Sequence, residues 1–341
     1  MKESPLHSLH CRLGAQMTDV GGWNMPQQFS DLIDEHLAAR ATCGMFDISH
    51  LGKFRLLGNG ALERLSHDLT ANLNSCRDGH CLQSLLLRDN GIILDRMTIF
   101  RQSAGNFFLL GSASLADSDF EHLKKQLDKA PLELINETDS LCGIALTGPD
   151  SHKVLAKVIH DAELPRRGCF CSFRRGGQRC TLSRSGLVTP DGYELFCPAA
   201  RGIAWFEQML AAGAVPCGHK TGEYLRISHG KPDMAHDMQN LTPAEANLHH
   251  LCSANIPTSA ASRLVSLRCH TPGHPLSPGD TVQTLDGGSV GRITSAAQAA
   301  GSGHSYAMAY ISSPHTAPGT HLQIVADGKT VPVMVESAEV V

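Results

Sequence analysis

Apolar and polar residues follow one another along the chain in two patterns, one typical of helices and one typical of strands. Between residues 30 and 41 the apolar Leu32, Ile33 and Leu37 recur at helical spacing. Acidic residues occupy the first turns of this segment, where the helix dipole favours negative charge. The segment therefore predicts a helix. Amphipathic spacing predicts further helices at 61–69, 116–127, 203–212 and 220–227.

Strand-like segments fill most of the space between these helices. Residues 53–57 alternate between polar and apolar, and three apolar runs follow at 82–87, 92–101 and 107–111. Turn residues separate the three runs, so they predict neighbouring antiparallel strands. Further strands are predicted at 143–146, 178–184 and 193–196. Because runs of strands and helices do not alternate strictly, the pattern predicts an α+β protein with antiparallel sheets.

The last 80 or so residues have a different pattern. Residues 257–262 are small and polar, which predicts a linker. Beyond the linker six short strands are predicted at regular intervals, at 265–269, 281–286, 290–294, 307–311, 321–325 and 331–335. The sequence Leu285 to Gly288 supplies a hairpin turn between two of them. This region predicts a small all-β barrel or sandwich.

Length, composition and charge indicate how many domains the chain can form and which partners it is not expected to bind. The chain has 341 residues, 42% of them apolar and 18% charged, which is enough for two or three domains with buried cores. Its net charge is -4, and no run of Lys or Arg is longer than a pair such as Lys124 and Lys125. We therefore expect neither nucleic acid nor a membrane surface to be a primary partner.

The sequence carries no sign of a membrane span or a targeting segment. No window reaches the roughly eighteen apolar residues that a spanning helix needs. Residues 1–9 lack the apolar core of a signal peptide and the Arg-rich pattern of a transit peptide. We expect a cytoplasmic protein, or a mitochondrial matrix protein only if a transit peptide has been removed.

Twelve cysteines are scattered between Cys11 and Cys269, without the short regular spacing of a disulfide-stapled secreted domain. We interpret them as reduced thiols. The closest pairs, Cys169 with Cys171 and Cys76 with Cys81, do not have the Cys-x2-Cys spacing that suits zinc. The sequence therefore predicts no metal site.

Three blocks near the N-terminus are the most specific signal in the chain: Gly-Gly-Trp-Asn-Met-Pro at 21–26, Asp-Glu-His-Leu-Ala-Ala-Arg at 34–40 and Gly-Met-Phe-Asp-Ile-Ser-His at 44–50. Together they resemble the signature of the T-protein (aminomethyltransferase) family of the glycine cleavage system. Later blocks follow in the family's order, at 69–72, 146–149, 191–195, 212–218, 225–226 and 236–238. The resemblance covers the whole chain.

The resemblance implies a fold and an activity. It implies three domains in a cloverleaf: a folate-binding core made of 1–50 and 137–256, an inserted α+β domain at 51–136, and a C-terminal β-barrel domain at 263–341. It also implies one-carbon transfer from the lipoyl arm of a partner, the lipoylated H-protein, to N5 of tetrahydrofolate, with release of ammonia.

The implied catalytic position departs from the family. The family carries paired aspartates at the end of a Gly-Gly-x-x-Asp-Asp block, and the second carboxylate stabilises positive charge that develops near N5. Here the block ends in Asp95 and Arg96. Because neighbouring side chains of a strand point to opposite faces, Asp95 would not simply replace the lost carboxylate. A tyrosine that the family places beside the folate is also replaced, by Leu187.

Other positions of the implied folate site can be carried over residue by residue. Glu194 matches the carboxylate that pairs with the amino group and ring N–H of the pterin, a geometry that suits two parallel donors. Arg226 matches an arginine that lines the site, and Ser112 stands where the family has asparagine. The resemblance also places Leu51 and Phe100 against the folate. From the residues alone, Glu194 could instead be a solvent-facing strand residue and Arg226 a cation on a helix surface.

Two other functions remain open. A folate-dependent demethylase would use Arg96 to bind a small anionic methyl donor, because a guanidinium recognises a carboxylate bidentately. A non-catalytic paralogue would keep the fold and bind folate or the H-protein without transferring a one-carbon group.

Overall fold

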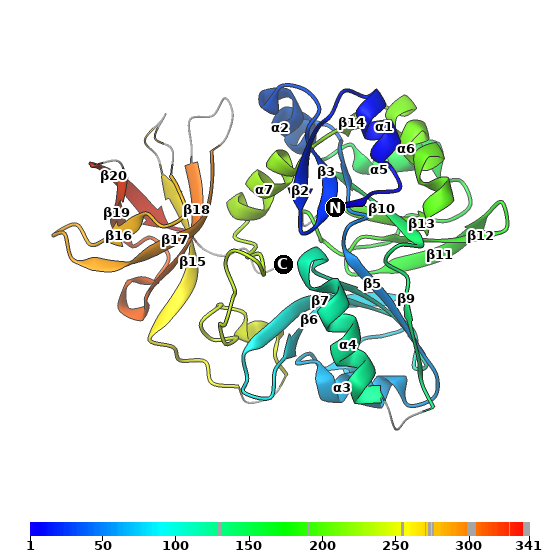
Figure 1. The fold of residues 1–341 in the computed structure, drawn as a ribbon, viewed down its shortest axis with the longest axis horizontal. Coiled ribbons are helices and arrows are strands. Elements are labelled where there is room, and N and C mark those ends of the chain that lie inside the picture. Colours follow the sequence, from blue (N-terminus) through cyan, green and yellow to red (C-terminus); the bar gives the residue numbers. More distant parts are fainter. Residues whose placement is uncertain are drawn as a thin grey trace. The chain divides into compact units, whose positions relative to one another are not determined.

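The computed structural model describes residues 1–127, 131–189, 191–253, 256–269, 271, 274, 276–298, 305–326 and 328–336 (Figure 1). The chain forms two compact units. The first contains residues 1–86 and 94–222, and the second contains 87–93 and 223–341. None of the helices in the described ranges combines the length and the apolar character that a bilayer span requires.

A six-stranded sheet is the largest layer of the first unit. Its strand order is β11-β12-β13-β10-β4-β14, antiparallel except where β14 pairs with β4. The strands are β4 (Gly44–Asp47), β10 (Leu141–Thr147), β11 (Phe170–Arg175), β12 (Gln178–Ser183), β13 (Tyr193–Pro198) and β14 (Val215–Pro216). Two helices, α5 (Ser151–Val158) and α6 (Gly202–Ala211), pack beside the sheet. Their apolar side chains and those of the strands form one buried core, which includes Leu146, Leu195 and Phe206.

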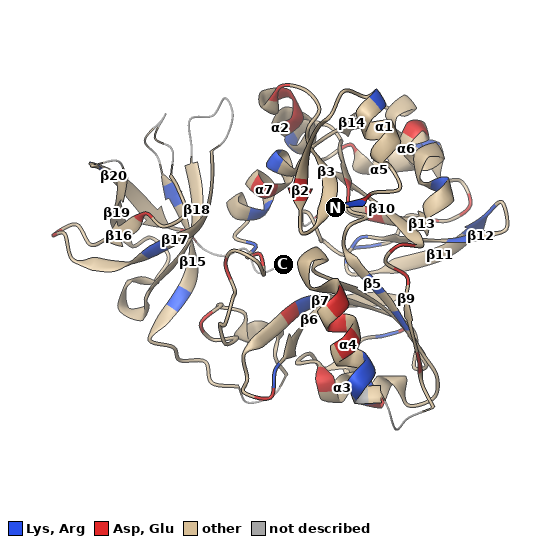
Figure 2. Ribbon diagram, viewed as in Figure 1, with Lys and Arg blue, Asp and Glu red and all other residues tan. Residues whose placement is uncertain are grey.

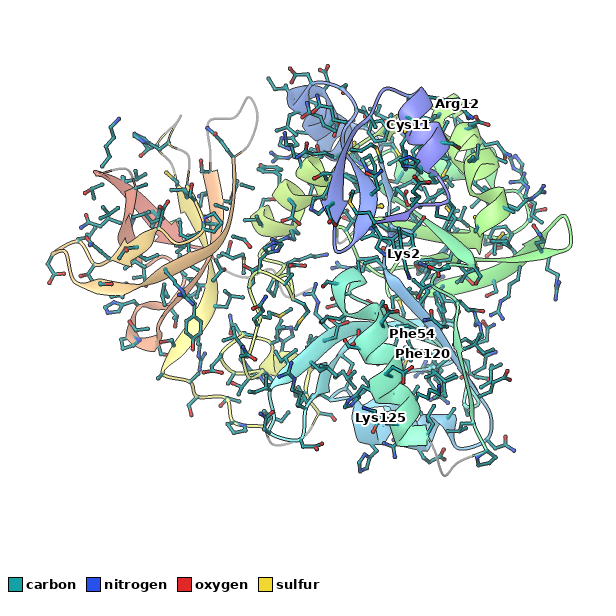
Figure 3. All side chains as sticks on the ribbon, in the orientation of Figure 1. Lys2, Cys11, Arg12, Phe54, Phe120 and Lys125 are labelled. Carbon is teal, nitrogen blue, oxygen red and sulfur yellow. The ribbon has the colours of Figure 1, made fainter. Side chains whose placement is uncertain are left out.

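A five-stranded antiparallel sheet forms a second layer of the same unit, in the order β6-β7-β8-β5-β9. Its strands are β5 (Gly52–Leu57), β6 (His80–Leu87), β7 (Ile93–Ser103), β8 (Asn106–Gly111) and β9 (Glu133–Asn136). Helices α3 (Ala61–Asp68) and α4 (Ala116–Leu127) contribute to its core. Phe54 on β5 and Phe120 on α4, labelled in Figure 3, have ring centroids 5.8 Å apart.

Helix α4 shows how local charge supports an element. Its first turn carries acidic residues and its last turn carries Lys124 and Lys125, seen as red and blue bands in Figure 2. This order complements the helix dipole. One of the first-turn acids, Asp119, is however fully buried. A buried carboxyl group requires a partner or a proton.

The N-terminal segment adds a small sheet in the order β1-β3-β2, formed by β1 (Lys2–Glu3), β2 (Gln16–Val20) and β3 (Trp23–Gln28), and the helix α1 (His7–Arg12). The buried carboxylate of Asp47 ties this segment to β4, because it accepts hydrogen bonds from the Ser4 hydroxyl and from His10 Nε2 at 2.8 Å. Burial opposes the charge, but His10 and the serine donors hold the pKa of Asp47 below its usual value.

Helix α2 (Leu32–Ala41) is present where the apolar spacing predicts it, but the buried face differs. Ile33 and Leu37 are 42% and 58% exposed, whereas Glu35 is fully buried. Its carboxylate accepts hydrogen bonds from four donors, the amides of Phe29, Ser30 and Gly218 and the hydroxyl of Thr221. A carboxylate with this many donors can be buried without a counter-ion.

The second unit contains a closed antiparallel barrel in the order β15-β18-β17-β16-β19-β20. Its strands are β15 (Ser262–Cys269), β16 (Thr281–Gln283), β17 (Ser289–Gln298), β18 (Ser305–Ser312), β19 (His321–Ala326) and β20 (Lys329–Val335). Alternate residues such as Leu267, Ile324 and Val333 fill the interior. Helix α7 (His219–Ser228) begins in the first unit and ends in the second.

The α+β class with antiparallel sheets and the C-terminal barrel are confirmed, and the barrel replaces the alternative of a sandwich. Every predicted helix and strand is present, with ends that differ by a few residues. The division into a core at 1–50 and 137–256 and an inserted domain at 51–136 stays a prediction. The two sheets on either side of these bounds belong to one compact unit. Of the predicted barrel domain, 263–341, the last described residue is Glu336.

Candidate functional site

Asp95 and Arg96 lie next to each other on β7, and their surroundings differ. Asp95 is fully buried, and its carboxylate accepts a hydrogen bond from the Ser112 amide at 2.7 Å and one from the Ser112 hydroxyl at 2.6 Å. Arg96 is only partly buried. Because side chains alternate along a strand, Arg96 projects from the opposite face. Asp95 is therefore held by the fold and does not occupy the position that Arg96 fills.

Asp119 of α4 is the second carboxyl group beside Asp95. A Cβ added at Gly111 would lie 2.9 Å from Asp95 Oδ2 and 3.1 Å from Asp119 Oδ2, so glycine leaves room for the two groups to meet. Burial, together with the charge of Asp95, raises the pKa of Asp119 to about 10. Burial also raises the pKa of Asp95, and the neighbouring Asp119 and the hydrogen bonds from Ser112 oppose that shift. Asp119 therefore carries a proton at neutral pH and lies as a neutral acid beside the Asp95 carboxylate.

Replacing Asp119 by asparagine should stabilise the protein at alkaline pH. The folded protein keeps the Asp119 proton up to about pH 10, whereas the unfolded chain loses it near pH 4. The free energy of unfolding therefore decreases as the pH rises from about 4 towards 10. The amide of Asp119→Asn keeps a donor for Asp95 and has no proton to lose. We expect the variant to exceed wild type by about 1–3 kcal/mol at pH 9 and by less at pH 6, measured by urea unfolding.

Asp117 is the matched control, because it lies on the same turn of α4 and is exposed. Asp117→Asn should leave the pH profile of stability unchanged. The proton assignment is wrong if Asp119→Asn lowers stability equally at both pH values.

Glu194 on β13 is 1% exposed, so its interpretation as a solvent-facing strand residue is wrong. Its carboxylate accepts hydrogen bonds from the Ser183 hydroxyl, from the Ser185 amide at 3.1 Å and from the Leu187 amide at 3.0 Å. Burial raises the pKa of Glu194, and these donors oppose the shift. These donors satisfy the carboxylate within the fold, so it can be buried without a counter-ion.

Arg226, on the part of α7 that belongs to the second unit, is not a free surface cation. Nε and Nη2 donate to the two carboxylate oxygens of Glu223, each at 2.7 Å, and Nη1 donates to Asp237 at 2.8 Å. Nη1 also donates to the Lys231 carbonyl and Nη2 to the Ser295 hydroxyl. These bonds use all five N–H groups of a guanidinium. Burial opposes its charge, but Glu223 and Asp237 raise the pKa of Arg226.

The two remaining predicted folate contacts lie in the first unit. Phe100 is fully buried, and its ring packs against those of Phe108, Phe170 and Phe196 at centroid distances of 5.6, 5.4 and 6.3 Å. The ring therefore joins the two sheets of the unit. Leu51 is half-buried in the turn between β4 and β5.

The structure thus places Asp95 and Ser112 in direct contact and adds Asp119, which sequence reasoning missed. A signal for Asp119 was present, because it falls on the face of α4 that carries the buried Ala116 and Leu123. An acidic residue on a buried helix face requires a partner or a proton.

Comparisons with known proteins cover both parts of the chain. Residues 6–255 match the model of the GCVT N-terminal domain, and residues 263–341 match that of the glycine cleavage T-protein C-terminal barrel domain. The aminomethyltransferase of Synechococcus elongatus is 32% identical, covering 97% of this chain and 94% of its own. The aminomethyltransferase of Deinococcus deserti is 29% identical, covering 97% and 94%.

A solved structure shows the same similarity. The glycine cleavage system aminomethyltransferase T from Bartonella henselae superposes with a TM-score of 0.89 at 25% sequence identity, covering 98% of this chain and 97% of that one.

Proposed function

The chain belongs to the glycine cleavage T-protein family, and from this premise we propose that it is an aminomethyltransferase that uses tetrahydrofolate as a substrate. It would transfer the one-carbon unit of an aminomethyl group, carried by the lipoyl arm of an H-protein, to N5 of tetrahydrofolate and release ammonia. The observation that carries the proposal is the match over nearly the whole chain to proteins named aminomethyltransferase.

Glu194 supports binding of the pterin. A buried carboxylate forms strong hydrogen bonds with donors such as those on the edge of a pterin, because little water competes for it. Arg226 offers no unused N–H to a ligand, since all five are bonded within the second unit. We therefore assign pterin recognition to Glu194 and not to Arg226.

Arg96 supports a second function of the same fold. A guanidinium destabilises a cation that develops beside it, but it binds a carboxylate in a bidentate geometry. A folate-dependent demethylase acting on a small anionic methyl donor is therefore the alternative. Release of a one-carbon group from a methylated amino acid to tetrahydrofolate, with no transfer from the aminomethylated H-protein, would establish it.

Calorimetry with tetrahydrofolate tests folate binding directly. We expect micromolar affinity for wild type and a loss of tenfold or more in Glu194→Gln, because an amide cannot replace both oxygens of the carboxylate. Glu163→Gln, at an exposed position of the same unit, is the control and should bind as wild type does. An absence of binding at millimolar tetrahydrofolate would leave only a non-catalytic paralogue.

A further inference from the structure

Lys53 on β5 is an unusual buried cation, with no exposed surface. Its Nζ donates hydrogen bonds to two backbone carbonyls, that of Ser49 at 2.7 Å and that of Leu51 at 2.8 Å. Lysine is rarely buried unless its charge is paired. Burial lowers the pKa of Lys53 to about 8, and the negative charge of Asp47 opposes that shift.

Both carbonyls belong to the turn 48–51, which joins β4 to β5 and so connects the two larger sheets of the first unit. Asp47 holds the same turn from its other end, because its Oδ1 accepts a hydrogen bond from the Ser49 amide at 2.8 Å. The N–H and the C=O of Ser49 are thus bonded to a buried carboxylate and to a buried ammonium. Charged partners make such bonds about twice as strong as neutral ones.

We propose that Lys53 is a positioning residue of the folate site. Its ammonium holds the turn 48–51 through the two carbonyls and so sets the position of Leu51 against the folate. The inference rests on the proposed function and on the family resemblance, which places Leu51 against the folate. Lys53 itself touches no substrate, since its ammonium is enclosed. When the ammonium is removed, the turn loses its charge-assisted bonds and folate affinity falls.

The groups around the ammonium predict the direction of the pH effect. Asp47, Cys142, Asp139 and Glu137 face it, and all of them favour its charged form. Ser4 and His10 act on it through Asp47. As the pH rises through about 8, Lys53 loses its proton and keeps only weaker, neutral hydrogen bonds to the two carbonyls. Folate affinity should therefore fall between pH 7 and pH 9.

The test is anaerobic calorimetry with tetrahydrofolate at pH 7 and pH 9. We expect the Kd of wild type to rise about three- to tenfold over this range. Lys53→Met should bind about tenfold more weakly than wild type at pH 7 and show no further loss at pH 9. Lys157→Met is the control, because Lys157 also donates to a backbone carbonyl, that of Ala212, but from an exposed position. It should follow the wild-type profile.

Hydrogen exchange separates this proposal from the proposed function. Peptides spanning residues 44–57 should be protected in wild type at pH 7, less protected at pH 9 after correction for the intrinsic rate, and unprotected around Leu51 in Lys53→Met. If wild type does not bind tetrahydrofolate, the proposed function fails, and the exchange data still decide whether Lys53 fixes the turn. A Lys53→Met protein that binds tetrahydrofolate as wild type does and keeps residues 44–57 protected at pH 7 overturns the proposal.

Discussion

Arg96→Asp is expected to raise the rate of one-carbon transfer from an aminomethylated H-protein to tetrahydrofolate by about 10²- to 10³-fold over wild type. The substitution puts a carboxylate at the position where the resemblance places the family's second aspartate. At a separation of about 4 Å, exchanging a repulsive charge for an attractive one is worth several kcal/mol in a partly dry site. Each 1.4 kcal/mol is a factor of ten in rate.

Single-turnover formation of methylenetetrahydrofolate measures this gain. Arg96→Asn separates loss of repulsion from gain of attraction and should give an intermediate rate. Arg88→Asp, on the exposed turn between β6 and β7, controls for the change in net charge and should remain at the wild-type rate. If Arg96→Asp is no faster than wild type, position 96 does not limit the transfer. If it abolishes transfer from a methylated acid, the demethylase function gains support.

The burial of Asp95 is what makes the Arg96 prediction specific. Had Asp95 faced the same side as Arg96, it could have replaced the missing carboxylate without any substitution. It is instead bonded to both donors of Ser112 and lies beside the buried carboxyl group of Asp119. These interactions fix its direction, so a new carboxylate at 96 would not compete with it.

The helices and strands predicted from the sequence are those whose apolar residues recur with the period of a helix or a strand. Strands such as β16, β19 and β20 of the barrel alternate over most of their length between buried and more exposed residues, so their period is visible without knowledge of their partners. Strand β11 was missed because its sequence, Phe-Cys-Ser-Phe-Arg-Arg, mixes apolar and polar residues and ends in two arginines. Helix α5 was missed because only two turns carry its apolar face.

Where tertiary contacts decide which residues are buried, the sequence pattern does not predict the buried face. In α2 the apolar spacing of Ile33 and Leu37 does not coincide with the buried face, because the donors around Glu35 come from segments as distant as Gly218 and Thr221. The hydrogen-bond partners in the candidate site also come from distant segments of the chain. The resemblance located Asp95, Ser112 and Glu194, but no local pattern could reveal which donors each carboxylate would find.

Arg226→Met is expected to destabilise the second unit by about 3–5 kcal/mol, the largest effect on stability that we predict. The substitution removes five hydrogen bonds and leaves the carboxylate of Asp237, whose side chain is fully buried, without its cation. Asp237 also accepts hydrogen bonds from Thr294 at 2.5 Å and Ser295 at 2.7 Å on β17. Loss of Arg226 therefore weakens the connection between α7 and the barrel within this unit.

Urea unfolding, monitored by hydrogen exchange in β17, measures this loss of stability. Arg292→Met, at an exposed position of the same strand, is the control and should change the free energy of unfolding by less than about 0.5 kcal/mol. Arg226→Lys keeps one charge but cannot reproduce the fork of five donors, so it should fall between wild type and Arg226→Met. A stable Arg226→Met protein that no longer binds tetrahydrofolate would contradict the structural role and return Arg226 to the folate site. A less stable protein whose folded fraction binds normally would show that the family's arginine serves here to hold the second unit together.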